Sequence, residues 1–307
     1  MTTALGRVFT LHGVAPRVQP RRSIYRNISD EATLTAILAA REPFVPLADA
    51  LAGRGDALTV DDATRTAADA ALLARRFGHA VTLFVNPSQV DPPVPYSFLL
   101  LSALLDGLRG HRVMLEGESF PTRSFRQRDV LRALLKEKLR DTPTEAERTS
   151  LIRALASEWR VGMLEIPRFL ETLEVADLQR LLDAGVEIQN HGWSHTCHIR
   201  LDPSESAREI ARGREWLSER LGIEARAFAV PYGDAMPHES TRLACDVWLT
   251  VDDRHPGGPI APGVFNRDTL EAPPKRGPLE ELRYRAERFV RRSKRRWPGL
   301  AKLGRGK

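Results

Sequence analysis

Cysteines, aromatic residues and long apolar runs are scarce in this sequence of 307 residues. The two cysteines, Cys197 and Cys245, exclude a framework of several disulfides and are typical of a reducing compartment. The longest apolar run, residues 98–105, is far shorter than the roughly 20 residues of a membrane-spanning helix. The first 14 residues lack the charged and then apolar layout of a secretory signal. We therefore expect a cytoplasmic protein.

Positive charge is concentrated at the end of the chain. The sequence holds 46 Lys and Arg against 40 Asp and Glu, which gives a formal net charge of +6. From Lys275 onward there are 13 basic and three acidic residues, so the preceding residues carry a small net negative charge. We expect a main domain over residues 1–274, followed by a basic helix and tail over residues 275–307.

The basic tail could bind a membrane or pack on the main domain. One helical face would carry Leu279, Leu282, Ala286, Phe289 and Val290, with arginines around it. Such a helix could lie on the anionic inner face of a membrane, or its apolar face could dock on the main domain. The tail has few aromatic residues and no nucleic-acid motif, so a nucleic-acid partner is not expected.

Strand and helix patterns alternate along most of the chain. Six β-type runs end in polar clusters, at residues 7–11, 57–60, 80–85, 186–188, 227–230 and 247–251. Helical periodicity occurs between several of them, at residues 67–77, 175–184 and 204–221. This alternation predicts an α/β fold with a parallel sheet, open or closed into a barrel, whose active site lies at the carboxyl ends of the strands.

Residues 88–160 interrupt the alternation. They contain no clear strand, but they show helical segments at residues 97–108, 127–139 and 144–158. We expect a helical insertion at the carboxyl ends of the strands, where it would act as a lid or shape the substrate site. Packing without a functional role is the alternative.

Two adjacent carboxylates, Asp61 and Asp62, end one predicted strand. In a cleft, one acid of such a pair can bind a metal while the other acts as a base. The alternative is a helix cap or turn that leads into the next helix.

Two histidines follow a predicted strand with H-x-x-x-H spacing, His191 and His195. Imidazoles at this spacing can reach one ion, and together with a carboxylate they suit zinc and neighbouring metals. Two surface histidines are the alternative. Cys197 and His198 are further candidate ligands, but both are more simply explained as bystanders.

In order, these motifs resemble the polysaccharide deacetylase family, carbohydrate esterase family 4, over residues 7–270. The first family motif, T-F-D-D-G, is similar to Thr59-Val60-Asp61-Asp62-Ala63, and the second, H-[ST]-x-x-H, to His191-Gly192-Trp193-Ser194-His195. The third ends in the turn Pro231-Tyr232-Gly233. The resemblance implies a distorted (β/α) barrel and a catalytic domain at residues 1–274. Ala63 and Gly192 depart from the pattern.

The resemblance also implies site roles. Asp61 would be the general base, with Asp62, His191 and His195 as ligands of a divalent metal, Zn²⁺ or alternatively Co²⁺ or Ni²⁺. Pro231 and Tyr232 would bind substrate, with the Tyr232 N–H holding the oxyanion. Arg267 would join them, either orienting Asp61 or lying exposed.

The position of the general acid has two candidates. Leu11-His12-Gly13-Val14 resembles the N-terminal Y-H-x-V element that carries the acid in some family members, which makes His12 the acid. His255 is the alternative. The implied reaction removes an N-acetyl or similar N-acyl group from an amino sugar, through metal-activated water. The alternatives are a silent glycan-binding relative or a hydrolase of non-sugar or lipid-linked amides.

Overall fold

The computed structural model describes residues 6–270, except residues 20, 21, 26, 109, 111, 234, 235, 237, 239, 240, 242, 243, 253, 254 and 256. The basic tail that the sequence predicts over residues 275–307 lies outside the described residues. Its helix and its proposed membrane contact therefore stay predictions.

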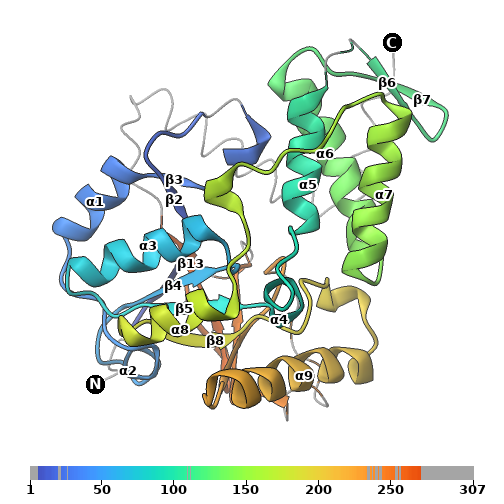
Figure 1. Cartoon of the computed structure of the whole chain (residues 1–307). Coiled ribbons are helices and arrows are strands. Elements are labelled where there is room, and N and C mark those ends of the chain that lie inside the picture. Colours follow the sequence, from blue (N-terminus) through green and yellow to red (C-terminus); the bar gives the residue numbers. More distant parts are fainter. Residues whose placement is uncertain are drawn as a thin grey trace.

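A nine-stranded sheet forms the centre of the fold (Figure 1). In spatial order its strands are β11 (Gly258–Ala261), β12 (Val264–Asn266), β10 (Val247–Thr250), β9 (Ala227–Ala229), β8 (Glu187–Asn190), β5 (Thr82–Val85), β4 (Ala57–Asp61), β1 (Val8–Leu11) and β13 (Asp268–Thr269). The strands pair in parallel, except that β11 is antiparallel to β12. All six expected strands are present, and their nearly continuous apolar runs are typical of parallel strands covered on both faces.

One short segment joins the two ends of this strand order. β12 and β13 lie near opposite ends of the order, yet only Arg267 separates Asn266 from Asp268 in the chain. The N–H of Arg267 donates to the carbonyl oxygen of Thr250 on β10. The sheet therefore curls until residues 264–269 join its edges, which confirms the expected distorted barrel.

Helices cover the outside of the curled sheet (Figure 1). The expected helices are α3 (Arg65–Arg76), α8 (Val175–Asp183) and α9 (Pro203–Leu221). The sequence analysis missed the short elements α1 (Glu31–Ala39), α2 (Leu47–Leu51), α4 (Pro87–Val90), β2 (Val14–Ala15) and β3 (Ser29–Asp30). The buried face of α3 consists largely of alanines, which let the helix pack closely on the largest apolar cluster.

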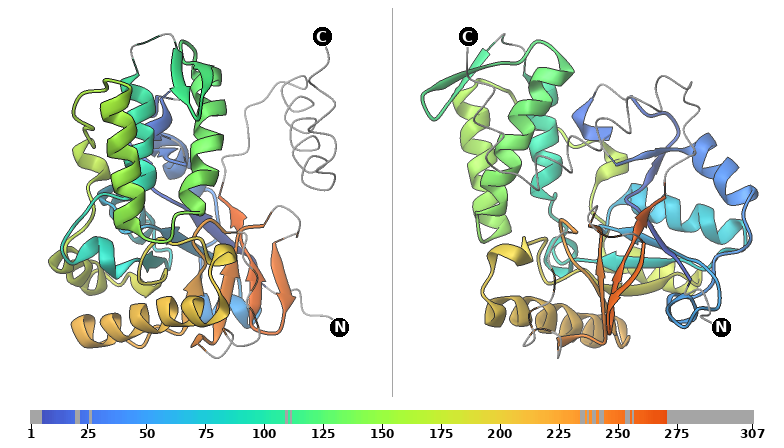
Figure 2. Two further views of the ribbon diagram at one scale, coloured as in Figure 1. Left: turned by 90° about the vertical axis from the view of Figure 1, so that its right-hand side faces the viewer. Right: turned by 180° about the vertical axis from the view of Figure 1, so that it is seen from behind.

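Three further helices pack together beside the sheet (Figures 1 and 2). They are α5 (Ser97–Gly107), α6 (Phe125–Arg140) and α7 (Glu145–Glu158), and they agree with the three helical segments expected there. Capping boxes at Ser124 and Thr144 begin α6 and α7. These helices share an apolar cluster of their own that includes Leu104, Leu131 and Ile152.

The expectation that residues 88–160 contain no strand is wrong. β6 (Arg112–Leu115) and β7 (Glu118–Pro121) form an antiparallel hairpin. Its two-residue turn has positive φ at both positions, Glu116 (53°) and Gly117 (80°), which is the requirement of a tight hairpin turn. The strands are short and largely exposed, so they lack the apolar run by which the central strands were found.

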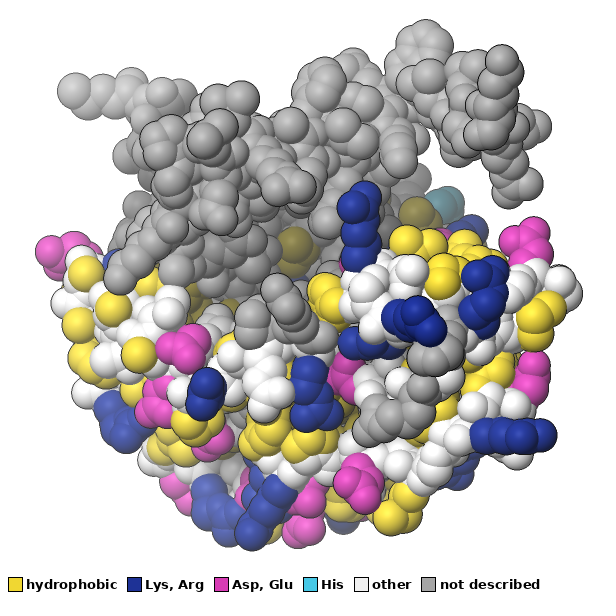
Figure 3. Space-filling model, turned by 90° about the horizontal axis from the view of Figure 1, so that it is seen from above, with side chains coloured by type: hydrophobic (Ala, Val, Ile, Leu, Met, Phe, Trp, Pro, Cys, Tyr) yellow, Lys and Arg dark blue, Asp and Glu magenta, His cyan; other side chains and the backbone are white. Residues whose placement is uncertain are grey.

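The described surface is of mixed charge. Lys and Arg side chains lie among Asp and Glu side chains on the described part of the face in Figure 3. Within the described ranges, no helix combines the length and the apolar character needed to span a membrane.

Candidate metal centre and active site

The carboxyl ends of neighbouring parallel strands bring the predicted site residues together. Asp61 ends β4 and Asp62 follows it, His191 follows β8, and Tyr232 lies in the turn after β9. His12 follows β1, which pairs in parallel with β4. Since carboxyl ends of parallel strands share one edge, residues far apart in the sequence meet there.

Among the described residues, Asp62, His191 and His195 form the group that could hold a metal ion. One ligand atom from each lies within 4.8 Å of the others. Asp62 Oδ1 is 3.7 Å from His191 Nε2 and 3.6 Å from His195 Nε2. Donors bonded to one tetrahedral zinc ion at about 2.1 Å are about 3.4 Å apart, so the spacing fits such an ion.

Asp62 has the features expected of a metal ligand. Its side chain is buried, and Oδ1 has no hydrogen-bond partner within the described structure. Its φ of 68° is uncommon for a residue other than glycine, and such strain is concentrated at functional sites. Burial, and next the charge of Asp61, raise the pKa of Asp62 well above its usual range. A cation at Oδ1 would relieve both penalties.

His191 is fixed by contacts from the sheet. Its Nδ1 donates to the carbonyl oxygen of Ala229 at 2.6 Å, which leaves the Nε2 lone pair directed to Asp62. The side chain of Asn86 donates to the carbonyl oxygen of His191. Burial lowers the pKa of His191 to about 4, so the ring is neutral near pH 7, as a metal ligand must be.

His195 is held mainly by the helical insertion. Its Nδ1 has no hydrogen-bond partner among the residues that the structure describes. Instead, the ring centroid lies 5.8 Å from that of Tyr96, 5.2 Å from that of Phe98 and 4.9 Å from that of Tyr232. Burial, followed by the nearby His191 and Arg148, lowers its pKa well below the usual range.

Asp61 and Arg267 form a buried, bidentate ion pair. The two guanidinium NH groups of Arg267 each lie 2.7 Å from one carboxylate oxygen of Asp61. Burial disfavours the charged carboxylate, but Arg267 outweighs it and holds the pKa of Asp61 well below its usual range. Of the two interpretations of Arg267, the exposed one is wrong, since the residue is 2% exposed. Its assignment as a substrate-binding residue stays a prediction.

His12 lies close enough to Asp61 and Arg267 to be influenced by both charges. Burial lowers its pKa, the Asp61 carboxylate opposes that shift, and Arg267 and Lys136 add to it. His12 is therefore uncharged near neutral pH in the free protein. To serve as an acid it must take up a proton during the reaction.

The turn after β9 adds Tyr232 to the edge of the site. Its backbone has a φ of 65°, and Pro231 before it is buried. From α6 of the insertion, Lys136 and Arg140 lie over its ring, at 5.5 Å and 5.4 Å from the centroid. The insertion thus covers this turn as well as His195.

Two further candidate ligands lie outside the metal-binding group. Cys197 is buried and accepts from Nε of Arg140 at 3.2 Å. The Nδ1 of His198 pairs with the hydroxyl of Ser206 at 2.7 Å, and its ring packs against Phe228. Both therefore act as structural residues, in agreement with their interpretation as bystanders.

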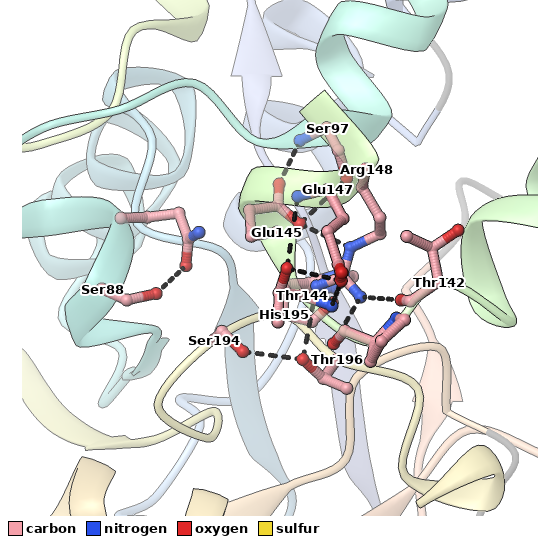
Figure 4. A network of polar contacts seen from close by, with 12 residues as sticks. Ser88, Ser97, Thr142, Thr144, Glu145, Glu147, Arg148, Ser194, His195 and Thr196 are labelled. Carbon is pink, nitrogen blue, oxygen red and sulfur yellow. Dashed lines mark hydrogen bonds and ion pairs between the residues drawn. The ribbon is translucent and has the colours of Figure 1, made fainter. Parts of the chain in front are cut away.

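The sequence analysis missed the polar residues of the insertion that reach the site. Arg148 on α7 is fully buried, and it donates to Glu145 and to the carbonyl oxygen of His195 (Figure 4). One signal was present in the sequence: Arg148 lies one turn before Ile152, on the buried face of α7. A basic residue on an apolar helix face requires a buried acceptor.

Comparisons with known proteins give a family match over part of the chain and a shared fold. Residues 173–247 match the family model described as polysaccharide deacetylase. No curated protein matches the chain in sequence.

Two solved structures share the fold. The structure of Streptococcus pyogenes deacetylase PplD in complex with acetate matches with a TM-score of 0.52 and 12% identity, over 91% of this chain and 96% of that one. BC0361, a polysaccharide deacetylase from Bacillus cereus, matches with a TM-score of 0.51 and 11% identity, over 87% of this chain and 65% of that one. At these identities the likeness shows the fold alone.

Proposed function

Because residues 173–247 match the model of the polysaccharide deacetylase family, a family of amide C–N hydrolases, we propose that the chain is a metal-dependent hydrolase that removes an N-acetyl or similar N-acyl group from an amino sugar. The metal would be a divalent ion, Zn²⁺ first, with Co²⁺ or Ni²⁺ as alternatives. Imidazole and carboxylate donors suit these ions.

One observation carries the proposal: two buried imidazoles converge on a buried carboxylate oxygen that has no hydrogen-bond partner among the described residues. Asp62 Oδ1 lies 3.6 Å from His195 Nε2 and 3.7 Å from His191 Nε2, and it has no hydrogen-bond partner within the described structure. A buried carboxylate without a partner is unfavourable in a protein with no ion. A catalytic site also needs open coordination positions, and three protein ligands leave them.

Asp61 and His12 would move the proton of the reaction. When bound, a divalent ion supplies Lewis-acid polarisation and lowers the pKa of water. The ionised Asp61, oriented by the two terminal nitrogens of Arg267, would take the proton of the attacking water. His12 would deliver a proton to the amine nitrogen as the C–N bond breaks. The products are then a small carboxylic acid and a free amine.

Tyr232 would stabilise the negative charge that develops on the substrate carbonyl oxygen. Its backbone N–H is at the turn after β9, and its ring packs against that of His195. A donor held in a rigid turn needs no reorganisation during the reaction, which is the advantage of backbone donors at such positions. Pro231, buried before it, would limit the movement of this turn.

Acetate release gives the test. The purified chain is incubated with N-acetylhexosamine oligomers and with lipid-linked N-acetyl sugars, before and after treatment with a chelator. We expect release that stops with the chelator and returns with zinc. Glycan binding and zinc binding without release would identify a silent relative. Release that is unaffected by complete metal removal would contradict the metal-dependent mechanism.

A further inference from the structure

Hydrogen bonds of the helical insertion connect the residue after Asp62 with the loop that carries His195, with Tyr96 and Ser97 joined through the chain. Figure 4 shows the part from Ser97 to His195 and Thr196. At one end, the hydroxyl of Tyr96 accepts from the N–H of Ala63, the residue after Asp62, at 2.9 Å. The next residue, Ser97, donates from both its N–H and its hydroxyl to the carboxylate of Glu145. Glu145 in turn accepts from Arg148 Nε at 2.7 Å.

Arg148 reaches the loop that carries His195. One of its terminal nitrogens, Nη2, donates to the carbonyl oxygen of His195 at 3.2 Å and to the hydroxyl of Thr196 at 3.3 Å. The other, Nη1, donates to the carbonyl oxygen of Thr142 at 2.8 Å, just before α7. The buried guanidinium of Arg148 therefore connects the segment just before α7 with the backbone of the His195 loop.

The two histidines differ in how their orientation is set. His191 has the usual outer partner of a ligating histidine, a carbonyl oxygen that binds its Nδ1–H. In the described structure His195 has no such partner on Nδ1. The orientation of His195 must therefore come from its ring neighbours and from the position of its backbone, which Arg148 holds.

We propose that Arg148 is a positioning residue for the metal centre: with Glu145, it fixes the His195 backbone so that Nε2 faces Asp62. The inference rests on the proposed function, since it requires Asp62, His191 and His195 to bind an ion. It also assigns the insertion a role other than that of a lid. The insertion completes the site by holding one ligand in place.

The chemistry of arginine explains why this residue type stands here. A planar guanidinium offers five donors in a fixed fork, so it can bind Glu145, the loop before α7 and the His195 loop together. A lysine at the same position would keep the charge beside Glu145. Its single ammonium could not reach all of these acceptors.

The test compares zinc binding in Arg148→Lys and in a matched control, Arg153→Lys. Arg153 is exposed on the same helix, so the control makes the same chemical change away from the loop. Zinc affinity is measured by competition with a chelating indicator, and the visible spectrum of the cobalt-substituted proteins reports the ligand geometry. We expect the zinc dissociation constant of Arg148→Lys to rise about 10- to 100-fold, as on loss of an outer-shell partner, with a changed cobalt spectrum.

A second variant keeps the inference testable if Arg148→Lys fails to fold. Thr196→Val removes one acceptor of Arg148 from the loop and leaves the ion pair with Glu145 in place. We expect weaker zinc binding in this variant too, by a smaller factor. Arg153→Lys should match the wild type in both measurements.

The outcomes separate this inference from the proposed function. If the wild type binds zinc and the Arg148 and Thr196 variants bind it equally well, with unchanged cobalt spectra, the positioning role is overturned and the metal centre stands. A fall in the thermal unfolding midpoint alone would also overturn the positioning role, because a purely structural role leaves zinc affinity unchanged. If the wild type binds no zinc, the proposed metal centre fails and this inference fails with it.

Discussion

The sheet and the helical insertion both support the candidate metal centre, and they do so by different means. On the sheet side, strand ends fix the residues directly: Asp61 is paired with Arg267, and His191 is bound to the carbonyl oxygen of Ala229. On the insertion side, His195 lies among aromatic rings while Arg148 holds its backbone. The sheet side depends on backbone register, whereas the insertion side depends on long side chains from another part of the chain.

This difference indicates how the two sides could vary independently. Parallel strand ends carry the proposed base, the proposed acid and two of the proposed ligands, so their positions are tied to the fold. The contacts of the insertion can change with its helices while the sheet stays the same. We therefore expect substitutions on the sheet side to have the larger effects, and substitutions on the insertion side to adjust metal affinity.

The largest expected effect concerns His12, the proposed proton donor on the sheet side. His12→Ala should lower turnover about 10²- to 10⁴-fold, the range for loss of a general acid, and should keep bound zinc because His12 is not a ligand. Steady-state kinetics and metal analysis of the same preparation measure both. Wild-type turnover in His12→Ala, with turnover lost in His255→Ala, would move the acid to the alternative residue.

The next largest effect is expected for the buried ion pair on the sheet side, whose contribution to stability is compared with that of a more exposed pair. Arg267→Met leaves the Asp61 carboxylate buried without its partner, and we expect a loss of about 3–5 kcal/mol in the free energy of unfolding. Arg7→Met breaks the more exposed pair between Arg7 and Asp268 and should cost about 0–1 kcal/mol. Urea unfolding of the metal-free proteins measures both. Equal losses would mean that Arg267 contributes no more than a surface arginine.

A smaller effect is expected where α9 packs on the His191 loop. A Cβ at Gly213 would overlap with Asn190 Oδ1, the atom that accepts from the N–H of Gly192 at 2.9 Å. Gly213→Ala should lose about 1–3 kcal/mol of unfolding free energy through overpacking, although alanine is normally favoured over glycine within a helix. Ser218→Ala, exposed on the same helix, is the control, with an expected change within about 0.5 kcal/mol. Stabilisation by Gly213→Ala would contradict the close packing.

The smallest effect concerns the insertion side at Asp62. Tyr96→Phe removes the hydroxyl that accepts from the N–H of Ala63 and should cost about 1 kcal/mol of unfolding free energy. Tyr25→Phe, which keeps the stacking of Tyr25 on Phe169, should leave that free energy within about 0.5 kcal/mol of the wild type. Thermal unfolding of the metal-free proteins provides the measurement. A loss in Tyr96→Phe as large as that in Arg267→Met would reverse the expected order of the two sides.

The sequence predicted the sheet side of the site because strand ends have a local signal. Asp61, His191 and the Pro231 turn each follow a short β-type run, and all six of those runs are strands. The closing segment of the barrel was not predicted as strands, because Asn266, Arg267 and Asp268 interrupt its apolar residues. The three-residue strand β9, by contrast, lies within an apolar run.

The insertion side was less predictable for a different reason. Its helices were found from their periodicity, and the spacing of Arg148 one turn before Ile152 places it on the buried face of α7. Which acceptors Arg148 meets there depends on where α7 lies relative to the His195 loop, and no local pattern carries that information. The β6–β7 hairpin was missed for a related reason, since most of its residues are exposed.

The central claim is that Asp62, His191 and His195 bind one divalent ion. The most direct measurement is zinc binding by the wild type and by Asp62→Ala. Calorimetric titration of the metal-free chains gives the stoichiometry, and mass spectrometry gives the zinc content after reloading. We predict one zinc ion per chain in the wild type and none in Asp62→Ala under the same conditions. Absence of zinc from the wild type, or equal binding in Asp62→Ala, would contradict this claim.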